Sequence, residues 1–346
     1  MSFWVRPARM DDLDAIYRMA QSAGGGLTNL PPVRDALAEK LARSNAALER
    51  KGALPESKDW AAADDRFVFA LVDAEGAVHG TSQIFAKVGL GHPFYSYRLG
   101  VMSQVSRELA STFRAEMLTL STDLDGSSEV GGLYVEPEAR SGGCGALMAR
   151  SRYLFIRRHR ARFADRTVAE LRGVIDEAGS SPFWDGLAGR FFGMSFREAD
   201  EFNAIHGNQF IADLMPKHPI YTALLAESAR EVIGMPHASG RPAMRMLEGE
   251  GFRFENYLDI FDGGPTMCIT TDRIATISNA REAVVAAIGL DPDSGEPSLI
   301  ATGQLADFRA AWGRVALGDE GAVLDAEVAQ MLSLKPGDFV TFVGKH

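Results

Sequence analysis

The sequence predicts an α+β fold, in which mixed and mostly antiparallel sheets are flanked by helices. Residues 66–84 have the pattern of a β-hairpin, because two apolar stretches enclose a turn that contains Asp and Gly. A strand pattern at residues 129–135 leads through a glycine-rich turn into a long helix. Residues 210–254 weakly repeat the order of the first half, which predicts two similar halves. Residues 286–346 have the pattern of a small β-rich C-terminal appendage.

The N-terminal part is predicted to begin with a strand followed by two helices. Residues 3–8 form a short apolar strand pattern, and the acidic residues of 11–14 mark the first turn of an amphipathic helix. The triple glycine at residues 24–26 ends this helix, and residues 33–48 predict a second one.

The elements after the hairpin alternate between strands, apolar segments and helices. In order, they are a helical or irregular stretch before 129, a strand at 129–135, a helix from 146, a strand at 167–175, a helix at 182–190, an apolar segment at 210–216, a helix at 220–230, an apolar segment at 232–234 and a helix at 241–250. We expect three parts: residues 1–200, 201–285 and 286–346.

Composition argues against several classes of function. The formal net charge of −10 disfavours general binding to nucleic-acid backbones. The N-terminus has no signal-peptide pattern and no apolar run is long enough for a membrane span, so we expect a cytoplasmic protein. Cys144 and Cys268 are too few for a disulfide framework, and the histidines show no ligand spacing, so we expect no metal.

Arginines are concentrated in and after the helix that follows the glycine-rich turn. We interpret them as the solvated side of that helix, with help in binding a polyanionic cofactor as the alternative. They are Arg150, Arg152, Arg157, Arg158, Arg160, Arg162 and Arg166.

The glycine-rich turn is the most informative stretch of the sequence. It lies between a strand and a helix start, where free backbone N–H groups and the helix dipole favour an anion such as a pyrophosphate. Gly143 and Gly145 would let the backbone approach this anion closely. The turn has neither a Walker ending nor the spacing of a dinucleotide fingerprint. Its residues are Arg140, Ser141, Gly142, Gly143 and Gly145.

This pattern resembles the acyl-CoA pyrophosphate loop of the GNAT superfamily of acyltransferases. More specifically, five segments resemble the arginine N-succinyltransferase family, from the N-terminus to about residue 275. They are residues 22–28, 172–177, 181–184, 214–221 and 257–266.

The resemblance implies both the fold and the activity. It implies tandem GNAT-like halves, and a cytoplasmic acyltransferase that transfers succinyl from succinyl-CoA to the α-amine of L-arginine in arginine catabolism. Succinyl-CoA would be a co-substrate, with no permanently bound cofactor. It also suggests a homo-oligomer, or a hetero-oligomer with a homologous subunit.

Two residues are candidates for the proton transfers of this reaction. The resemblance points to His237 as the proton donor, and imidazole titrates near working pH. Glu129 lies in the strand position where many GNAT enzymes have a general base. The alternatives are a structural histidine and a glutamate that caps a loop edge.

The substrate contacts follow largely from the resemblance. The backbone of Leu133 and Val135 would pair with the pantetheine arm, and Leu133 matches the family's succinyl-CoA contact. Lys217 and His218 could bind the distal succinyl carboxylate, or form an exposed loop. For the amino acid we consider Gly25, Gly26, Leu27 and Thr28, and the stretch 259–262.

Other functions remain open at this point. An ornithine succinyltransferase would have the same motifs, because the sequence does not measure the length of the amino-acid pocket. A non-catalytic acyl-CoA-binding partner subunit or sensor is a further alternative, although it has no chemical need for His237, Glu129 and the complete loop together. The second half lacks a similar glycine loop, so we expect one acyl-CoA site per chain and a second half that shapes the amino-acid pocket.

Overall fold

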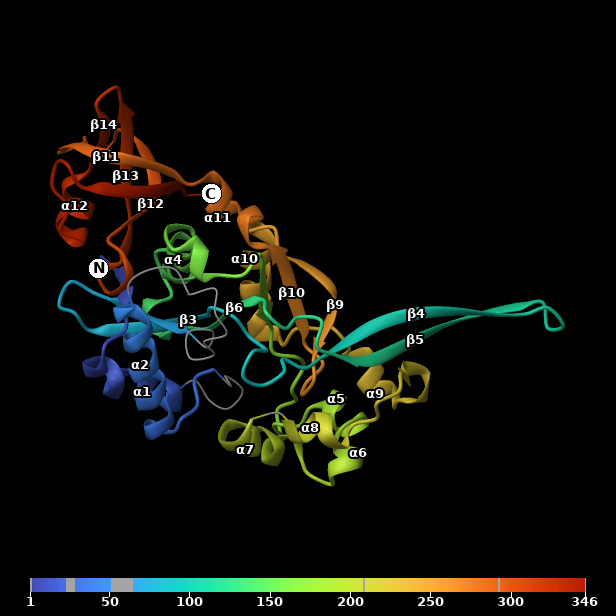
Figure 1. The fold of residues 1–346 in the computed structure, drawn as a ribbon. Coiled ribbons are helices and arrows are strands. Elements are labelled where there is room, and N and C mark those ends of the chain that lie inside the picture. The colour runs from blue at the N-terminus through green and yellow to red at the C-terminus, as the bar shows by residue number, and fades with distance from the viewer. Residues whose placement is uncertain (1, 23–28, 51–64, 208, 292, 346) are drawn as a thin grey trace. The chain divides into compact units, whose positions relative to one another are not determined.

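The computed structural model describes residues 2–22, 29–50, 65–207, 209–291 and 293–345, which form two compact units. The first unit combines Met1–Ala86, Val130–Asp165 and Thr270–His346, and the second combines Lys87–Glu129 and Arg166–Ile269. Figure 1 labels many of the elements of both units. The predicted division at residues 200 and 285 stays a prediction.

The N-terminal half of the first unit is a sheet covered by helices. Its strand order is β1 (Trp4–Pro7), β2 (Arg66–Val72), β3 (Val78–Phe85) and β6 (Ser128–Val135), with β6 contributing its residues from Val130 onward. Helices α1 (Leu13–Ser22) and α2 (Arg34–Glu49) bury Ile16 and Leu41 in one cluster with Val68 of β2. Helix α4 (Cys144–Arg158) contributes Phe155, whose ring centroid lies 5.0 Å from those of Phe67 and Phe69.

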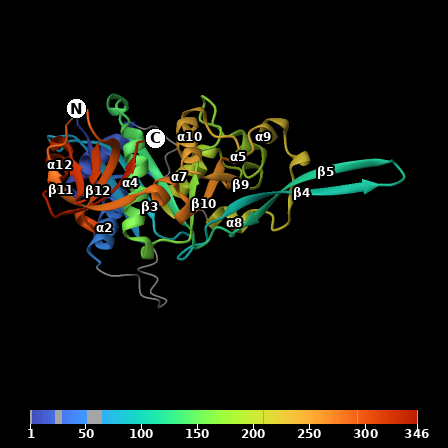
Figure 2. The same ribbon diagram turned by 90° about the horizontal axis from the view of Figure 1, so that it is seen from above.

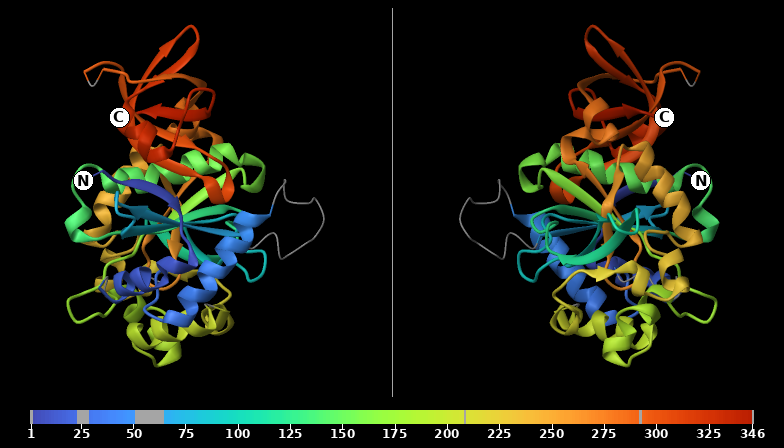
Figure 3. Two further views of the ribbon diagram at one scale, coloured as in Figure 1. Left: turned by 90° about the vertical axis from the view of Figure 1, so that its left-hand side faces the viewer. Right: turned by 90° about the vertical axis from the view of Figure 1, so that its right-hand side faces the viewer.

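The C-terminal half of the first unit is rich in strands, which confirms the predicted β-rich appendage. It contains β11 (Arg281–Ile288), β12 (Glu296–Thr302), β13 (Arg309–Gly318), β14 (Gly321–Leu324), helix α12 (Ala326–Leu332) and β15 (Phe339–Gly344). Strand β13 pairs antiparallel with β1, so these strands extend the N-terminal sheet, as the blue and red ribbons of Figure 3 show.

The second unit is a mixed sheet with short helices. Its strand order is the start of β6, then β7 (Arg166–Glu170), β10 (Pro265–Thr270), β9 (Arg253–Asp259), β4 (Ser96–Ser106), β5 (Ser111–Ser121) and β8 (Ile220–Tyr221). Strands β6 and β7 pair in parallel at Ser128↔Thr167 and Glu129↔Val168, whereas β10, β9, β4, β5 and β8 pair antiparallel. The α+β prediction is therefore confirmed.

The helices of the second unit are mostly short. They are α5 (Pro182–Gly186), α6 (Gly189–Phe192), α7 (Phe196–His206), α8 (Gln209–Leu214), α9 (Glu227–Glu231) and α10 (Arg241–Gly249). Trp184 of α5 stacks on Phe261 at 5.6 Å between ring centroids, in a core that also contains Tyr97 and Leu258.

Several predicted elements differ from the structure. The stretch expected to be helical or irregular contains the β4–β5 hairpin, whose tip extends away from the rest of the second unit (Figure 2). Strand β7 ends at Glu170 rather than at residue 175, because the chain then makes only an isolated bridge, Gly173↔Pro236. The apolar segment 210–216 lies mostly in helix α8.

Two predicted helices also have different bounds. Residues 182–190 divide between α5 and α6, and residues 220–230 divide among β8, a 3-10 turn and α9. Helices α2, α4 and α10 lie close to where the sequence predicted them. Within the described residues no helix is long and apolar enough to cross a membrane. The cytoplasmic location stays a prediction.

The arginines of α4 are not a solvated face, contrary to the sequence interpretation. Arg150 and Arg152 of α4 are buried, and so is Arg162 in the 3-10 helix Arg160–Arg162 that follows it. Arg150 donates hydrogen bonds to Thr276 Oγ1 and to the carbonyl of Gly344, while Arg152 donates to the carbonyls of Ala149 and Gly131. Burial is possible because these guanidinium groups have acceptors inside the fold.

Candidate functional site

The predicted phosphate loop has the geometry of an anion site at the start of α4. The short 3-10 helix Pro137–Ala139 leads into it, and Arg140 donates from Nε to the carbonyl of Val135 at 3.0 Å. Gly142 and Gly143 have φ angles of +67° and +85°, a region that favours glycine. Gly143 is the N-cap of the helix, whose positive end therefore faces the loop.

Two C-terminal residues lie against this loop, and no sequence motif pointed to either. Trp312 of β13 donates from Nε1 to the carbonyl of Gly143 at 3.4 Å. The Lys345 ammonium lies 4.9 Å from the centroid of the Trp312 ring and would be 3.9 Å from a Cβ at Gly143. A cation therefore stands beside the positive end of a helix, an arrangement that becomes favourable when an anion lies between them.

Strand β6 contains the other predicted cofactor contacts. Leu133 is partly exposed and Val135 is buried. Gly132 just before them has a φ of +57°, and a Cβ there would lie 2.7 Å from Nε2 of Gln83. A glycine with positive φ inside a strand is a local irregularity, and such irregularities often occur beside active sites.

Glu129 lies at the start of β6, in the second unit, and is only 5% exposed. It pairs in parallel register with Val168 of β7. Glu170 lies two residues further along β7, so both glutamates project from the same face of the sheet. The sequence prediction of a strand position for Glu129 is confirmed, and Glu170 had been given no role.

Glu170 is surrounded by other carboxylates. Burial, followed by the charges of Asp259, Glu129 and Asp262, raises its pKa well above the ordinary value. Burial also raises the pKa values of Asp259 and Asp262. Asp259 Oδ1 accepts from the backbone N–H groups of Phe261 and Asp262, at 2.6 and 3.0 Å. Asp259 therefore also holds the turn that follows β9.

His237 lies next to the end of β7. The bridge between Gly173 and Pro236 brings the two segments together, and the His237 backbone N–H donates to the carbonyl of Arg172 at 2.8 Å. His237 Nδ1 lies 2.7 Å from Ser239 Oγ and accepts from the Ser239 backbone N–H at 3.2 Å. In the neutral ring the proton is therefore assigned to Nε2.

The positive charge of Arg172 acts on His237. Burial, and then the charge of Arg172, lower the pKa of His237. The same charge acts on Asp262 and Asp200 by lowering their pKa values, against the larger effect of burial. Arg172 Nε is buried without a hydrogen-bond partner in the part of the chain that the structure describes.

Among the described residues, the remaining predicted substrate contacts have no bond to His237 or to the carboxylates. Lys217 and His218 are exposed in the loop after α8, and the Lys217 ammonium donates to the carbonyl of Ala212. Among the described residues, no hydrogen bond or ion pair links either side chain to His237 or to the carboxylates. Gly25, Gly26, Leu27 and Thr28 lie outside the described residues.

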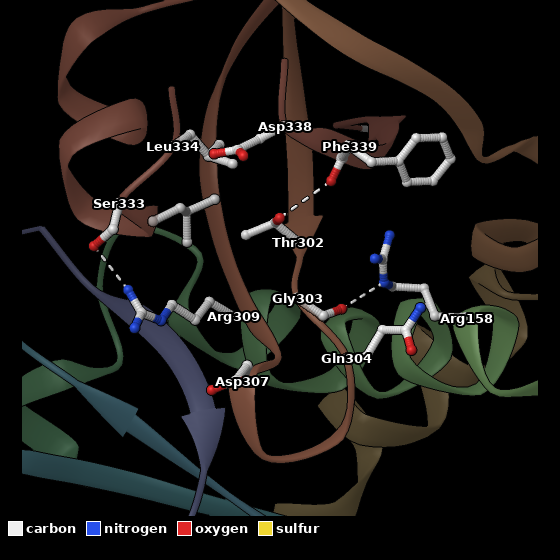
Figure 4. Close-up of a pocket in the computed structure, with 11 residues that line it drawn as sticks. Arg158, Thr302, Gly303, Gln304, Asp307, Arg309, Ser333, Leu334, Asp338 and Phe339 are labelled. Carbon is white, nitrogen blue, oxygen red and sulfur yellow. Dashed lines mark hydrogen bonds between the residues drawn. The ribbon is translucent and has the colours of Figure 1, made fainter. Parts of the chain in front are cut away.

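A cavity of about 410 Å³ lies elsewhere, among the C-terminal strands of the first unit. Its arginines are already bonded: Arg158 donates to the carbonyl of Gly303, and Arg309 donates to Ser333 Oγ (Figure 4). None of the predicted site residues lines this cavity.

Known proteins resemble this chain over almost its whole length. A protein named arginine N-succinyltransferase from Escherichia coli (strain 55989 / EAEC) is 41% identical over 341 residues, which is 98% of this chain and 96% of the relative. A protein of the same name from Shigella flexneri is 40% identical over the same shares. A solved structure of arginine/ornithine succinyltransferase subunit AI from Pseudomonas aeruginosa superposes with a TM-score of 0.88 and 33% identity, covering 99% of this chain and 98% of that one.

Two family models account for the chain. The model of the arginine N-succinyltransferase beta subunit matches residues 3–276, and the model of its C-terminal domain matches residues 281–344. The sequence resemblance had become weaker in the tail, but the second model covers it. The chain therefore belongs to the arginine N-succinyltransferase beta subunit family.

Proposed function

We propose that this protein transfers the succinyl group of succinyl-CoA to the α-amine of L-arginine, releasing CoA and N2-succinylarginine as a step of arginine catabolism. The observation that carries this proposal is the likeness to proteins named arginine N-succinyltransferase, at 41% identity over 98% of the chain. The α+β fold with the β6–loop–α4 segment supports it, because an acyl-CoA needs an anion site at a helix start.

In this proposal the loop from Arg140 to Gly145 binds the pyrophosphate of succinyl-CoA. Backbone N–H groups of Gly143 and Gly145 and the positive end of α4 provide the attraction, and Lys345 adds a charge. The backbone of Leu133 and Val135 pairs with the pantetheine arm. Succinyl-CoA is a co-substrate that is bound and released in each cycle.

Glu129 and His237 divide the proton transfers. Glu129 removes the proton from the attacking α-amine, which then forms the amide bond as the thioester C–S bond breaks. His237 in its protonated form passes the Nε2 proton to the leaving thiolate and becomes neutral. A donor whose pKa lies below 6.5 transfers a proton readily to a thiolate whose thiol has a pKa of about 8.5. Both residues return to their starting states by exchange with solvent.

The distal succinyl carboxylate has a separate proposed contact. Lys217 and His218 are exposed and cationic or titratable, so they could bind it when substrate is present. Replacing both and finding the preference for succinyl-CoA over acetyl-CoA unaltered would exclude this role.

Ornithine is the second candidate amine. The observation in its favour is the name of the Pseudomonas aeruginosa structure, which includes both arginine and ornithine and describes a subunit. The same name supports an assembly with a homologous chain, whereas a homo-oligomer is the simpler alternative.

Release of free CoA thiol from succinyl-CoA tests the function directly. The reaction is run with L-arginine, L-ornithine or no amine, using the wild type and His237→Ala. Arginine-dependent release that is lost in the variant supports the proposal. Release with ornithine alone would change the substrate and keep the mechanism. Tight succinyl-CoA binding without release would indicate a non-catalytic partner subunit or sensor.

A further inference from the structure

We propose that Glu170 and Asp259 bind the side-chain cation of the amino-acid substrate, with the hydroxyl groups of Ser96 and Thr266 beside them. This inference rests on the proposed function, because it identifies the part of the second unit that distinguishes a cationic amino acid from a neutral one.

Strand register puts the β4, β9 and β10 side chains on one face of the sheet. Ser96 is directly opposite Asp259, and Arg98 is directly opposite Tyr257, in the antiparallel pair β4–β9. Opposite residues of an antiparallel pair project from the same face. The Arg98 guanidinium lies 5.7 Å from the Tyr257 ring centroid, as this arrangement requires. Thr266 of β10 is opposite Tyr257, so it shares that face as well.

Packing puts Glu170 on the same face. Val168 of β7 lies in one apolar cluster with Tyr257 and Cys268. Glu170 is two residues beyond Val168, and side chains two apart along a strand project to the same side. The opposite face carries Tyr97 and Leu258, which belong to the aromatic core with the helices. The polar face is therefore separate from that core.

The two hydroxyl groups are an observation independent of the carboxylates. Ser96 is 1% exposed and Thr266 is fully buried, yet within the described ranges neither Ser96 Oγ nor Thr266 Oγ1 has a hydrogen-bond partner. Buried hydroxyl groups nearly always have one, because leaving such a group unbonded is costly. A guanidinium offers several N–H donors in a planar arrangement, so one such group can serve carboxylate and hydroxyl oxygens together.

Charge and access favour an organic cation. Glu170 is in the field of Asp259, Glu129 and Asp262, while the positive charge of Arg172 acts on Asp262. Glu170 and Asp259 keep part of their surface exposed, so a ligand can reach them. Among the described residues, no three His, Cys, Asp or Glu side chains are arranged to hold a metal ion. His237 contacts Arg172, two residues after Glu170, so a cation held here lies near the proposed proton donor.

Equilibrium binding of L-arginine to the full chain, measured by calorimetry, tests the inference without turnover. Glu170→Gln keeps the shape of the side chain and removes its charge. Loss of a charge-assisted hydrogen bond predicts a Kd for arginine that is about 10- to 100-fold higher. Citrulline, which is the neutral analogue, should bind weakly to both proteins. Glu248→Gln, at an exposed position of α10, is the matched control and should leave the Kd unchanged.

Two further readouts separate this inference from the proposed function. Arginine binding to the wild type should tighten as pH rises, because the carboxyl groups ionise, and this dependence should be smaller in Glu170→Gln. An unchanged Kd and an unchanged arginine-to-citrulline preference in Glu170→Gln would overturn the inference, as would no binding of arginine to the wild type. Normal arginine binding without CoA release would overturn the proposed function and leave the inference standing.

Discussion

The neighbours of His237 determine what its ring can do. Because Nδ1 accepts from the Ser239 backbone, Nε2 is the nitrogen that can donate to a leaving group. His237→Gln should therefore lower kcat about 10²- to 10⁴-fold, because an amide N–H can hydrogen-bond but cannot transfer a proton. The KM for succinyl-CoA should change little. Steady-state CoA release measures both constants.

Ser239→Ala is the control for His237. It removes the hydroxyl and keeps the backbone N–H that fixes the ring, so its kcat should fall far less than that of His237→Gln. A kcat for His237→Gln equal to that of the wild type would exclude the proton-donor role.

Arg172 is the group that connects His237 to the carboxylates by charge. Its positive charge lowers the pKa of His237, so Arg172→Met should raise that pKa toward the ordinary value. NMR titration of the His237 ring measures the change, with Arg245→Met, at an exposed position of α10, as the control. A His237 titration that is identical in the wild type and Arg172→Met would show that burial alone sets the pKa.

At the scale of elements, two glycines of the β6–loop–α4 segment, Gly143 and Gly145, differ in backbone conformation. Gly143 has a φ of +85°, whereas Gly145 has an ordinary φ and open space around its Cβ position. Gly143→Ala should destabilise the fold by about 1–2 kcal/mol, because a side chain is unfavourable in that backbone region. Gly145→Ala should leave stability unchanged or raise it by about 0.5 kcal/mol.

Binding of succinyl-CoA separates these variants from a purely structural role. If the phosphate groups approach the backbone as proposed, Gly145→Ala should weaken binding although the fold is intact. Urea unfolding and calorimetry of succinyl-CoA binding measure the two effects. Full affinity in Gly145→Ala would mean that the phosphate groups do not approach at this residue.

Local patterns explain which elements the sequence could predict. The order of strand, glycine turn and helix is contained in one short segment, so β6, the loop and α4 followed from it. The β4–β5 hairpin was missed because its outer part exposes apolar residues such as Val105 and Phe113, which hides the usual alternation. The loop residues and Glu129 could be chosen from local motifs. Glu170, Ser96 and Thr266 share a face of the sheet only because of strand register, which no local pattern specifies.

At the scale of the whole molecule, Trp312 of β13 and Lys345 after β15 lie against the loop that we propose binds CoA. Lys345→Gln should raise the KM for succinyl-CoA about two- to fivefold, the range expected for an exposed charge pair. The effect should diminish at high salt. Lys335→Gln, in the turn before β15, is the control. Equal KM values at low salt for Lys345→Gln and the wild type would exclude a contribution from Lys345 to succinyl-CoA binding.

The carboxylate group should also make the stability of the protein depend on pH. The pKa of Glu170 is raised in the folded state, so its neutral form stabilises the fold below the unfolded pKa of about 4.3, and this contribution is lost as pH rises through the folded pKa. Glu170→Gln stays neutral at every pH. Its thermal midpoint should therefore exceed that of the wild type at pH 8, by about 2 °C, and the difference should shrink at pH 5.

Bound L-arginine should also change the thermal midpoint by an amount that depends on pH. A cation bound between Glu170 and Asp259 removes the repulsion that the charged carboxylates cause, so arginine should raise the wild-type midpoint more at pH 8 than at pH 5. Glu170→Gln should respond less, because it has already lost one of the charges. Thermal unfolding followed by circular dichroism, with citrulline as the neutral control, measures both effects. Without arginine, the thermal midpoints of the wild type and Glu170→Gln are compared at both pH values. If their difference is the same at pH 5 and pH 8, the titration of Glu170 does not contribute to stability in this range.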